Sequence, residues 1–286
     1  MDARFWLLQL FNGVSYGALL FLLGSGLSLI FGVMRIVNLA HGTFFLLAGY
    51  VGLAVISGTG SWWLAIPAAA LAIALLGVAM ERLFLRPLGS EPLRQVLLTF
   101  GFVLLIQQAT LDIWGGSNFE INPPTALMHS LVLGGVYLPL YRIFIIAVAA
   151  AIGVILSLVL DRTRAGAVVR ATVDDAQMAR GVGIDTSRVS MLTFGLGALL
   201  AGLGGVIGGA FLGIYPGLDF EILPLAFAVV IIGGMGSLAG AAIGAIVVGL
   251  ADNFGKVLFP QASYFTLYAP LVLLLAIRPT GLFGRE

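Results

Sequence analysis

The chain has 286 residues, of which 60% are hydrophobic and only 9% charged, and its mean hydropathy is +1.11. Soluble domains carry about 25% charged residues, so lipid must surround most of this chain, and a soluble fold is excluded. The formal net charge of +1 gives no reason to expect nucleic acid as a partner. The lack of cysteine excludes disulfides, thiolate metal sites and cysteine nucleophiles.

A helix needs about 20 apolar residues to cross the hydrocarbon core of a bilayer. Nine segments have that character, near 8–32, 36–57, 62–81, 95–114, 138–160, 189–213, 218–235, 239–257 and 262–278. The first is interpreted as a membrane helix rather than a removed signal peptide, because no convincing small-residue cleavage site follows Arg4. The seventh and eighth are joined by "GGMGSLAG" and could form a glycine-rich broken or partly re-entrant pair. The sequence therefore predicts an all-α membrane protein of eight or nine transmembrane helices, forming one domain over 1–286.

Arginines cluster in three of the connecting stretches, and positive residues in short loops mark the cytoplasmic side. The three groups are Arg82, Arg86 and Arg94; Arg162, Arg164, Arg170, Arg180 and Arg188; and Arg278 and Arg285. The opposite loops are acidic, with Glu120 in 115–137, and Asp219 and Glu221 in "YPGLDFEI". We therefore expect the C-terminus in the cytoplasm and, counting back, the N-terminus in the periplasm.

Small residues recur every fourth position along two of the expected helices. In lipid this spacing lets helix backbones approach closely. The pattern predicts either a tight interface that lines a moving pathway or static helix packing. The residues at this spacing are Gly197, Ala201, Gly205, Gly209 and Gly213 in one helix, and Gly236, Gly240 and Gly244 in the other. Gly233 and Gly234 join Gly236 and Gly240 at the expected helix break.

The motifs of an enzyme are missing from the sequence. Gly255 and Lys256 are the nearest approach to a Walker A motif, but the following Ser or Thr and the upstream glycine are absent. The two histidines, His41 and His129, have no H-x-x-x-H partner, so neither a catalytic site nor a metal site is expected.

Few charges fall inside the predicted membrane helices. They are Asp112, Arg142, Asp252 and Lys256, most of them near an expected helix end, and the last two could pair at the i, i+4 spacing. An ion-driven carrier usually needs a deeper relay of such groups. The energy for any uphill transport is therefore expected to come from outside this chain.

The stretch "RATVDDAQMARGVGID" (170–185) lies in a polar loop, 161–188, that holds nine of the 27 formal charges. Thr172 and Asp175 fit the S/T-x-x-D/E start of a helix, with Arg180 in its last turn and Gly181 and Gly183 ending it. Small side chains share one face of this helix: Val173, Ala176 and Ala179. The pattern favours a short cytoplasmic helix on which another protein docks, although an ordinary solvated loop is the alternative.

Three stretches together resemble the permease subunits of ABC importers for branched-chain amino acids and related hydrophobic solutes. "GLSLIFGVMRIVNLAHGTFFLLAGYVG" (26–52) contains the N-x-A-H-G motif of that family. Residues 170–185 resemble its ATPase-docking loop, and "VIIGGMGSLAGAAIGA" (230–245) resembles its glycine-rich helix break. The resemblance covers essentially the whole chain and looks closer to the first, LivH-like, of the two permeases in such systems.

The resemblance implies a larger machine in the bacterial inner membrane. Two permeases would form the pathway, two cytoplasmic ATPases would bind ATP and magnesium, and a periplasmic binding protein would deliver the solute. This chain itself would carry no cofactor. The matching residues for ATPase coupling are Arg170, Ala171, Asp174, Asp175, Ala179, Gly183 and Ile184, and those for the pathway are Asn38, His41 and Gly42.

Two details of the N-x-A-H-G stretch stay open. Thr43 departs from the acidic or serine residue often found next in the family, which leaves the local polarity undecided. His41 is equally well explained as a satisfied polar residue at a helix start.

The solute is open at this stage. Branched-chain amino acids come first, but related permeases handle urea or amides, aromatic acids and sugars. Two other classes of function compete with the importer: an ion-coupled carrier that uses Asp252 or Asp112, and a passive channel lined by glycine-rich helices. Co-purification with an ATPase would distinguish the importer from both.

Overall fold

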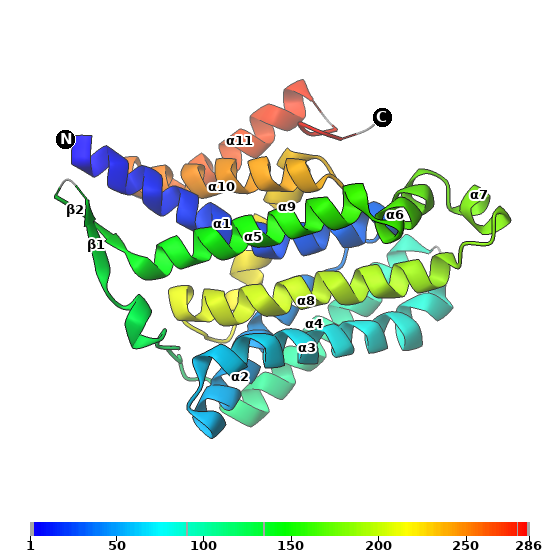
Figure 1. Cartoon of the computed structure of the whole chain (residues 1–286), viewed down its shortest axis with the longest axis horizontal. Coiled ribbons are helices and arrows are strands. Elements are labelled where there is room, and N and C mark those ends of the chain that lie inside the picture. The colour runs from blue at the N-terminus through cyan, green and yellow to red at the C-terminus, as the bar shows by residue number, and fades with distance from the viewer. Residues whose placement is uncertain (1–2, 90, 134, 279, 285–286) are drawn as a thin grey trace.

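The computed structural model describes residues 3–89, 91–133, 135–278 and 280–284. Helices running in alternating directions make up a bundle, with a small hairpin of strands at one end and two short helices at the other (Figure 1). The helices are α1 (Ala3–Met34), α2 (Ala40–Thr59), α3 (Trp62–Met80), α4 (Pro92–Trp114), α5 (Leu140–Arg162), α6 (Arg164–Asp174), α7 (Ala176–Gly181), α8 (Thr186–Leu212), α9 (Leu218–Gly233), α10 (Leu238–Leu258) and α11 (Ser263–Ile277).

The described chain also contains short turns of other helix types. A π-helical turn, Glu81–Leu85, and a 3-10 turn, Arg86–Leu88, continue α3. Two further 3-10 turns cover Thr125–Leu127 and Pro260–Ala262.

Among the described residues, seven helices are long and apolar enough to cross a membrane. They are α1, α2, α3 with its continuation to Leu88, α4, α5, α8 and α10. Each of the nine segments predicted from the sequence contains a helix, but α9 has 16 residues and α11 has 15, fewer than the roughly 20 that a full crossing needs. The chain is therefore a helical multi-pass membrane protein in which seven helices meet the length expected of a span.

The strands β1 (Ser130–Leu133) and β2 (Val136–Pro139) pair antiparallel, with Leu131 opposite Leu138. The sequence predicted a loop over 115–137, so the hairpin was not expected. A second tie lies nearby, where Phe119 and Ile214 exchange two backbone hydrogen bonds of 2.8 Å. The Phe119–Ile214 pair holds the chain after α4 against the segment that follows α8.

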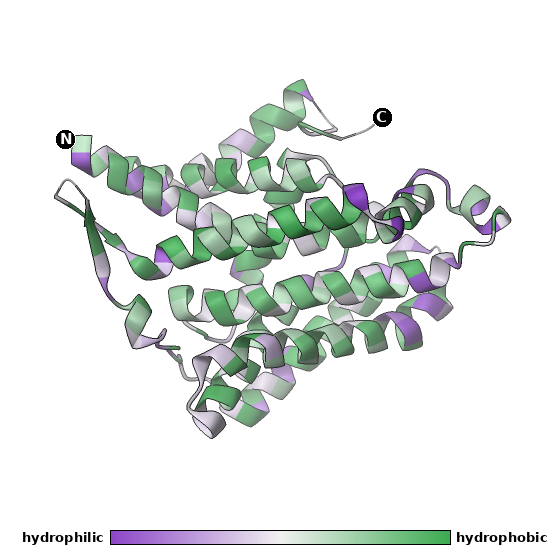
Figure 2. Cartoon of the chain, in the orientation of Figure 1, coloured by the Kyte–Doolittle hydropathy of each residue, from purple (hydrophilic) through white to green (hydrophobic). Residues whose placement is uncertain are grey.

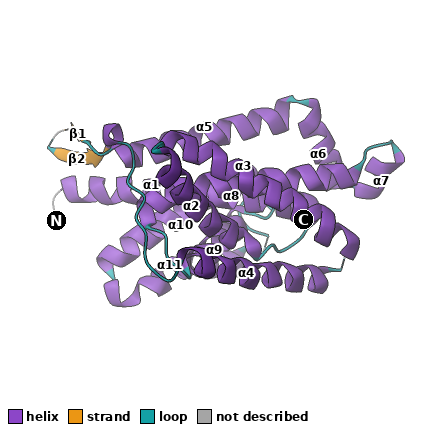
Figure 3. Ribbon diagram, turned by 90° about the horizontal axis from the view of Figure 1, so that it is seen from below, coloured by secondary structure: helices purple, strands orange, loops and turns teal. Residues whose placement is uncertain are grey.

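Burial separates central from peripheral helices. In the most apolar stretch of α1, 72% of the residues are buried inside the chain, compared with 17% in α5 and 22% in α4. Figure 3 shows α4 and α5 on opposite sides of the bundle, with α1 and α8 between them. Apolar residues also cover the outer faces of these helices (Figure 2), as lipid or a neighbouring membrane subunit requires.

The two central helices pack backbone to backbone. A Cβ on Gly26 of α1 would lie 2.6 Å from the carbonyl oxygen of Gly197 of α8, and a Cβ on Gly197 would lie 2.8 Å from that of Gly26. Both distances are too short for any side chain. The close approach explains why glycine is needed on both helices.

Candidate functional site

The N-x-A-H-G motif lies at a helix start inside the bundle. His41 is fully buried, and its Nε2 donates to the carbonyl oxygen of Leu23, 2.9 Å away. Leu23 precedes the end of α1 at Met34 by eleven residues, which corresponds to about 16 Å of helix. The segment 35–39 must therefore turn back along α1 before α2 begins, and α2 starts at depth rather than at the membrane surface.

Polar side chains accept hydrogen bonds from backbone N–H groups where the chain turns back. Asn38 is fully buried and its Oδ1 accepts from the backbone N of Ala40 at 3.1 Å. The N–H of Leu39 is 3.3 Å from Thr99 Oγ1 of α4. Within the described part of the chain, the buried atoms Asn38 Nδ2 and His41 Nδ1 have no hydrogen-bond partner.

Asp219, in the first turn of α9, connects three helices beside this motif. It is only 2% exposed, and its Oδ2 accepts from Thr43 Oγ1 of α2 and from Gln107 Nε2 of α4, each at 2.8 Å. Gly42 permits the approach, since a Cβ there would lie 2.8 Å from the carbonyl oxygen of Asp219. Thr43 thus supplies the polar contact that the sequence left undecided.

The assignment of Asp219 to an outer loop was wrong. Backbone 213–217 turns back into the bundle after α8, so that α9 begins with Asp219 already buried. Sequence reasoning missed both Asp219 and Gln107 as members of a buried polar site. The available sequence signal was Gly217, directly before the helix. In the structure this glycine adopts φ +95°.

Glu221, two residues further on, has a different environment. It is exposed and its Oε2 accepts from the hydroxyl of Tyr215 at 2.8 Å. The Tyr215 hydroxyl is the donor of this bond.

The polar segment forms two helices rather than one, which corrects the predicted helix start. Thr172 is buried near the end of α6, where its hydroxyl donates to the carbonyl oxygen of Val168 at 2.9 Å. The chain becomes extended at Asp175, whose Oδ1 accepts from the backbone N–H groups of Gln177 at 2.8 Å and Met178 at 2.9 Å. Asp175 alone is therefore the N-cap of α7, the role for which Asp is favoured.

Side-chain directions on α7 differ from the predicted small docking face. Ala179 is only 3% exposed and contributes to the packing of this chain. The exposed apolar side chains are Met178, at 68%, and Val182, at 74%. A partner that approaches from outside would therefore meet Met178 and Val182 first.

The other residues assigned to coupling surround α7. Arg170 contacts the carbonyl oxygen of Leu160 through its guanidinium group, and Asp174 is exposed at the end of α6. Ala171 is half-buried. After α7, Gly183 adopts φ +89°, and the N–H of Ile184 donates to the carbonyl oxygen of Ala179 at 3.0 Å.

Glycines also occupy the break between α9 and α10. Gly234 and Gly236 adopt φ +95° and +84°, in the left-handed region that favours glycine. Gly233 and Gly240 face each other so closely that a Cβ on either would overlap the backbone of the other. The segment 282–283 closes over the break, where the N–H of Leu282 donates to Ile232 O at 2.9 Å and that of Phe283 to Gly233 O at 3.0 Å.

The glycines of α8 are not equivalent. A Cβ on Gly205 would overlap the carbonyl oxygen of Phe45, whereas one on Gly209 would meet side-chain atoms of Ile214 and Ile121 at 3.0 to 3.3 Å. Gly213 adopts φ +81° at the helix end. Gly205 therefore tolerates a larger side chain least, because backbone cannot move aside as a side chain can.

The charged residues near the helix ends have partners on their own or neighbouring helices. Lys256 Nζ and Asp252 Oδ2 are 2.7 Å apart, which confirms the pairing predicted from their spacing. Arg142 lies 4.7 Å from the ring centroid of Phe211. Asp112 accepts from Gln108 at 2.8 Å. In the described residues, no three His, Cys, Asp or Glu side chains come together as a metal site would require.

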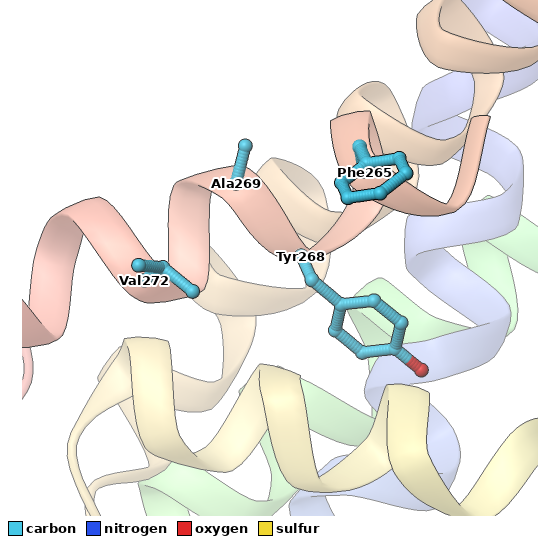
Figure 4. A pocket seen from close by; sticks show the side chains of 4 residues that line it. All are labelled: Phe265, Tyr268, Ala269 and Val272. Atoms are coloured by element: carbon cyan, nitrogen blue, oxygen red, sulfur yellow. The ribbon is translucent and has the colours of Figure 1, made fainter. Parts of the chain in front are cut away.

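An apolar hollow of about 460 Å³ lies along α11 and is lined by Phe265, Tyr268, Ala269 and Val272. Figure 4 shows the Tyr268 ring reaching toward the neighbouring helices while Ala269 points the opposite way. Phe265 and Val272 are largely exposed. Such a largely apolar surface suits lipid or another membrane helix.

Comparison with known proteins places this arrangement in a family. Residues 9–277 match the family described as "Branched-chain amino acid transport system / permease component". The chain belongs to this family of permeases. It is the permease component of an ABC transport system, a transport subunit rather than an enzyme, and ATP binding lies with separate ATPase subunits.

Named relatives support the same conclusion. The permease is 30% identical to the high-affinity branched-chain amino acid transport system permease protein BraD of Pseudomonas aeruginosa, and 30% identical to LivH of Escherichia coli K12. Each alignment covers 98% of this chain and 96% of the relative. LivM of Escherichia coli K12 is 28% identical over 91% of this chain and 67% of its own length. No solved structure matches the chain.

Proposed function

We propose that this permease forms, with a second permease subunit, the translocation pathway for branched-chain or related hydrophobic amino acids. Two ATPases would drive it from the cytoplasm, and a periplasmic binding protein would supply the solute. The observation that carries the proposal is α7, a capped helix that projects beyond the bundle (Figure 1) with apolar side chains exposed. The 28% identity to LivM favours a heterodimer of two similarly folded permeases.

The distribution of positive charge supports an orientation. Ten of the fourteen Lys and Arg residues lie at the α7 end of the bundle: Arg35, Arg82, Arg86, Arg94, Arg162, Arg164, Arg170, Arg180, Arg188 and Arg278. At the hairpin end the structure has Arg4, Arg142 and Lys256. By the positive-inside rule the α7 end faces the cytoplasm. The start of α1 would then be periplasmic, in a bacterial inner membrane.

Nine passes through the membrane are proposed, at the upper end of the sequence-based expectation. The short helix α9 can complete a pass because the turned-back segment 213–217 covers part of the depth before it. Transporter helices that begin or break inside the membrane commonly lie beside the solute. On this ground α2 and α9, with Asn38, His41 and Gly42, are proposed to border the pathway, and Gly233, Gly234, Gly236 and Gly240 to form the broken pair.

Coupling is proposed to run through α6 and α7. Met178 and Val182 would enter a groove of the ATPase, while Ala179 holds α7 against its own chain. Arg180 Nε, 2.9 Å from Thr186 Oγ1, would pass the movement of α7 to the start of α8. Arg170, Ala171, Asp174, Asp175, Gly183 and Ile184 would shape this segment rather than form the docking surface.

The runner-up proposals keep the same architecture with another solute, namely urea or amides, aromatic acids or sugars. An ion-coupled carrier is less well supported, because Asp252 is paired with Lys256 and Asp112 is exposed and accepts from Gln108. The decisive test is reconstitution of the permease in liposomes, alone and with its genomic partners. Accumulation of labelled L-leucine is expected only with ATPases, ATP and binding protein. Accumulation by the isolated chain in a sodium or proton gradient would overturn the proposal.

A further inference from the structure

A polar cavity of about 560 Å³ lies at the α7 end of the bundle. Its walls come from the end of α1, the π-helical turn after α3, the start of α4, both short helices α6 and α7, and the start of α8. Pockets that bind small molecules have volumes of about 300–1,000 Å³. The cavity is separate from the buried group around Asp219, which lies near the start of α2.

Glu81 is the buried acidic residue of this cavity. It is 2% exposed and opens the π-helical turn, and its Oε2 atom has no hydrogen-bond partner among the residues that the structure describes. An unpaired buried carboxylate oxygen is costly unless the group is protonated or a partner of opposite charge reaches it. Because π-helical turns inside longer helices are frequent at functional sites, this position is better explained by a ligand than by packing.

The remaining charges of the cavity lie nearer to solvent. Three exposed arginines, Arg35, Arg86 and Arg180, and two exposed carboxylates, Asp174 and Asp175, line it. With Glu81, positive and negative groups are equal in number. A simple anion would face three carboxylates and a simple cation three guanidinium groups, so a ligand that carries both charges fits best.

We infer that this cavity binds a small zwitterion, the free amino acid that transport delivers to the cytoplasm. The ammonium group would meet Glu81, the carboxylate would meet the arginines, and an apolar side chain would lie against Val33 and Leu85, which also line the cavity. This inference rests on the proposed function and adds a regulation to it. An amino acid held between Glu81 and Arg180 ties α7 to the core, so accumulated product slows further import.

The test uses the complete transporter in liposomes, with ATP and increasing unlabelled L-leucine enclosed on the α7 side. The initial rate of uptake of labelled L-leucine from the binding protein is measured. In the wild type the rate is expected to fall as enclosed leucine rises. Glu81→Gln should need about tenfold more enclosed leucine for the same inhibition, since a charged hydrogen-bond partner is lost. Glu91→Gln is the matched control, because Glu91 pairs with Arg94 at 2.9 Å and does not line the cavity.

The outcomes separate the two proposals. Absence of ATP-dependent uptake in the wild type would count against the proposed function itself. If uptake is normal but its rate does not change with enclosed leucine, the regulatory site is refuted while the proposed function stands. Equal inhibition of the wild type and Glu81→Gln has the same meaning. If Glu81→Gln does not assemble, inhibition by enclosed leucine is measured instead in Arg86→Gln, whose residue is exposed. Weaker inhibition than in the wild type supports the site, and unchanged inhibition refutes it. Enclosed 4-methylpentanoate, which lacks the ammonium group, should inhibit neither protein.

Discussion

Thr43 at the start of α2 and Asp219 at the start of α9 are joined by a 2.8 Å hydrogen bond, although 176 residues separate them in the chain. Helix N-termini carry partial positive charge. The carboxylate therefore lies where two helices can stabilise it, and Gln107 of α4 adds a second donor to the same oxygen. One side chain thus fixes how α2, α4 and α9 meet at the proposed pathway.

Replacing Asp219 with alanine should destabilise this junction. Thr43 and Gln107 would both lose their acceptor, and each buried donor left unsatisfied costs about 1–3 kcal/mol. We expect a lower thermal unfolding midpoint of the purified permease and a loss of uptake. Asp219→Asn, which keeps an acceptor oxygen, should be milder. Glu221→Ala is the matched control, and an equal effect of the two alanine variants would show that the buried junction has no special role.

Gly205→Ala should impair folding or assembly. The added Cβ would overlap the carbonyl oxygen of Phe45, and overpacking of this kind typically costs about 1–3 kcal/mol. Gly101→Ala provides the comparison, because Gly101 lies on exposed α4 with no atom near its Cβ position. Alanine there should be neutral or stabilising. The readouts are the yield of the assembled transporter and its thermal unfolding midpoint. If both are unchanged in Gly205→Ala, the close packing of α2 against α8 is wrong.

Asp175→Ala should loosen α7 without disturbing the membrane helices. The variant loses the cap to Gln177 and Met178, which is worth about 1 kcal/mol. Faster hydrogen exchange over 176–181 and less uptake per ATP hydrolysed are expected. The Asp175→Asn variant should resemble the wild type in both measurements, because Asn also caps helices. Failure of Asn to restore them would mean that the charge of Asp175, rather than its cap, is what matters.

Asp252→Asn should leave ATP-driven uptake within about twofold of the wild type. The side chain of its partner Lys256 is 61% exposed, whereas that of Asp252 is only 10% exposed. The asparagine side chain keeps an oxygen that can accept a hydrogen bond from Lys256, so the loss is expected to be small. Uptake by reconstituted transporter is compared in the presence and absence of sodium and proton gradients. Abolished uptake, or uptake that follows either gradient, would favour the carrier alternative.

The sequence could predict the membrane helices because apolar length and arginine position are local properties. It placed the start of α9 at 218, as observed, but it could not predict that this helix start is buried inside the bundle. "YPGLDFEI" has the composition of an outer loop, and only the tertiary contact with Thr43 and Gln107 shows that Asp219 is buried. The same limit applies to Ala179, since periodicity finds a small-residue face but cannot tell whether that face packs inward or outward.

Cross-linking can show whether α7 transmits the movement of an ATPase to this permease. The chain has no native cysteine, so Met178→Cys or Ala179→Cys introduces a single thiol. In the assembled transporter, Met178→Cys should cross-link to a cysteine placed in the ATPase groove, with a yield that changes on addition of ATP. The buried Ala179→Cys should react far less. If Met178→Cys forms no cross-link with any groove position, or if the yield does not change on addition of ATP, α7 does not transmit the movement of the ATPase.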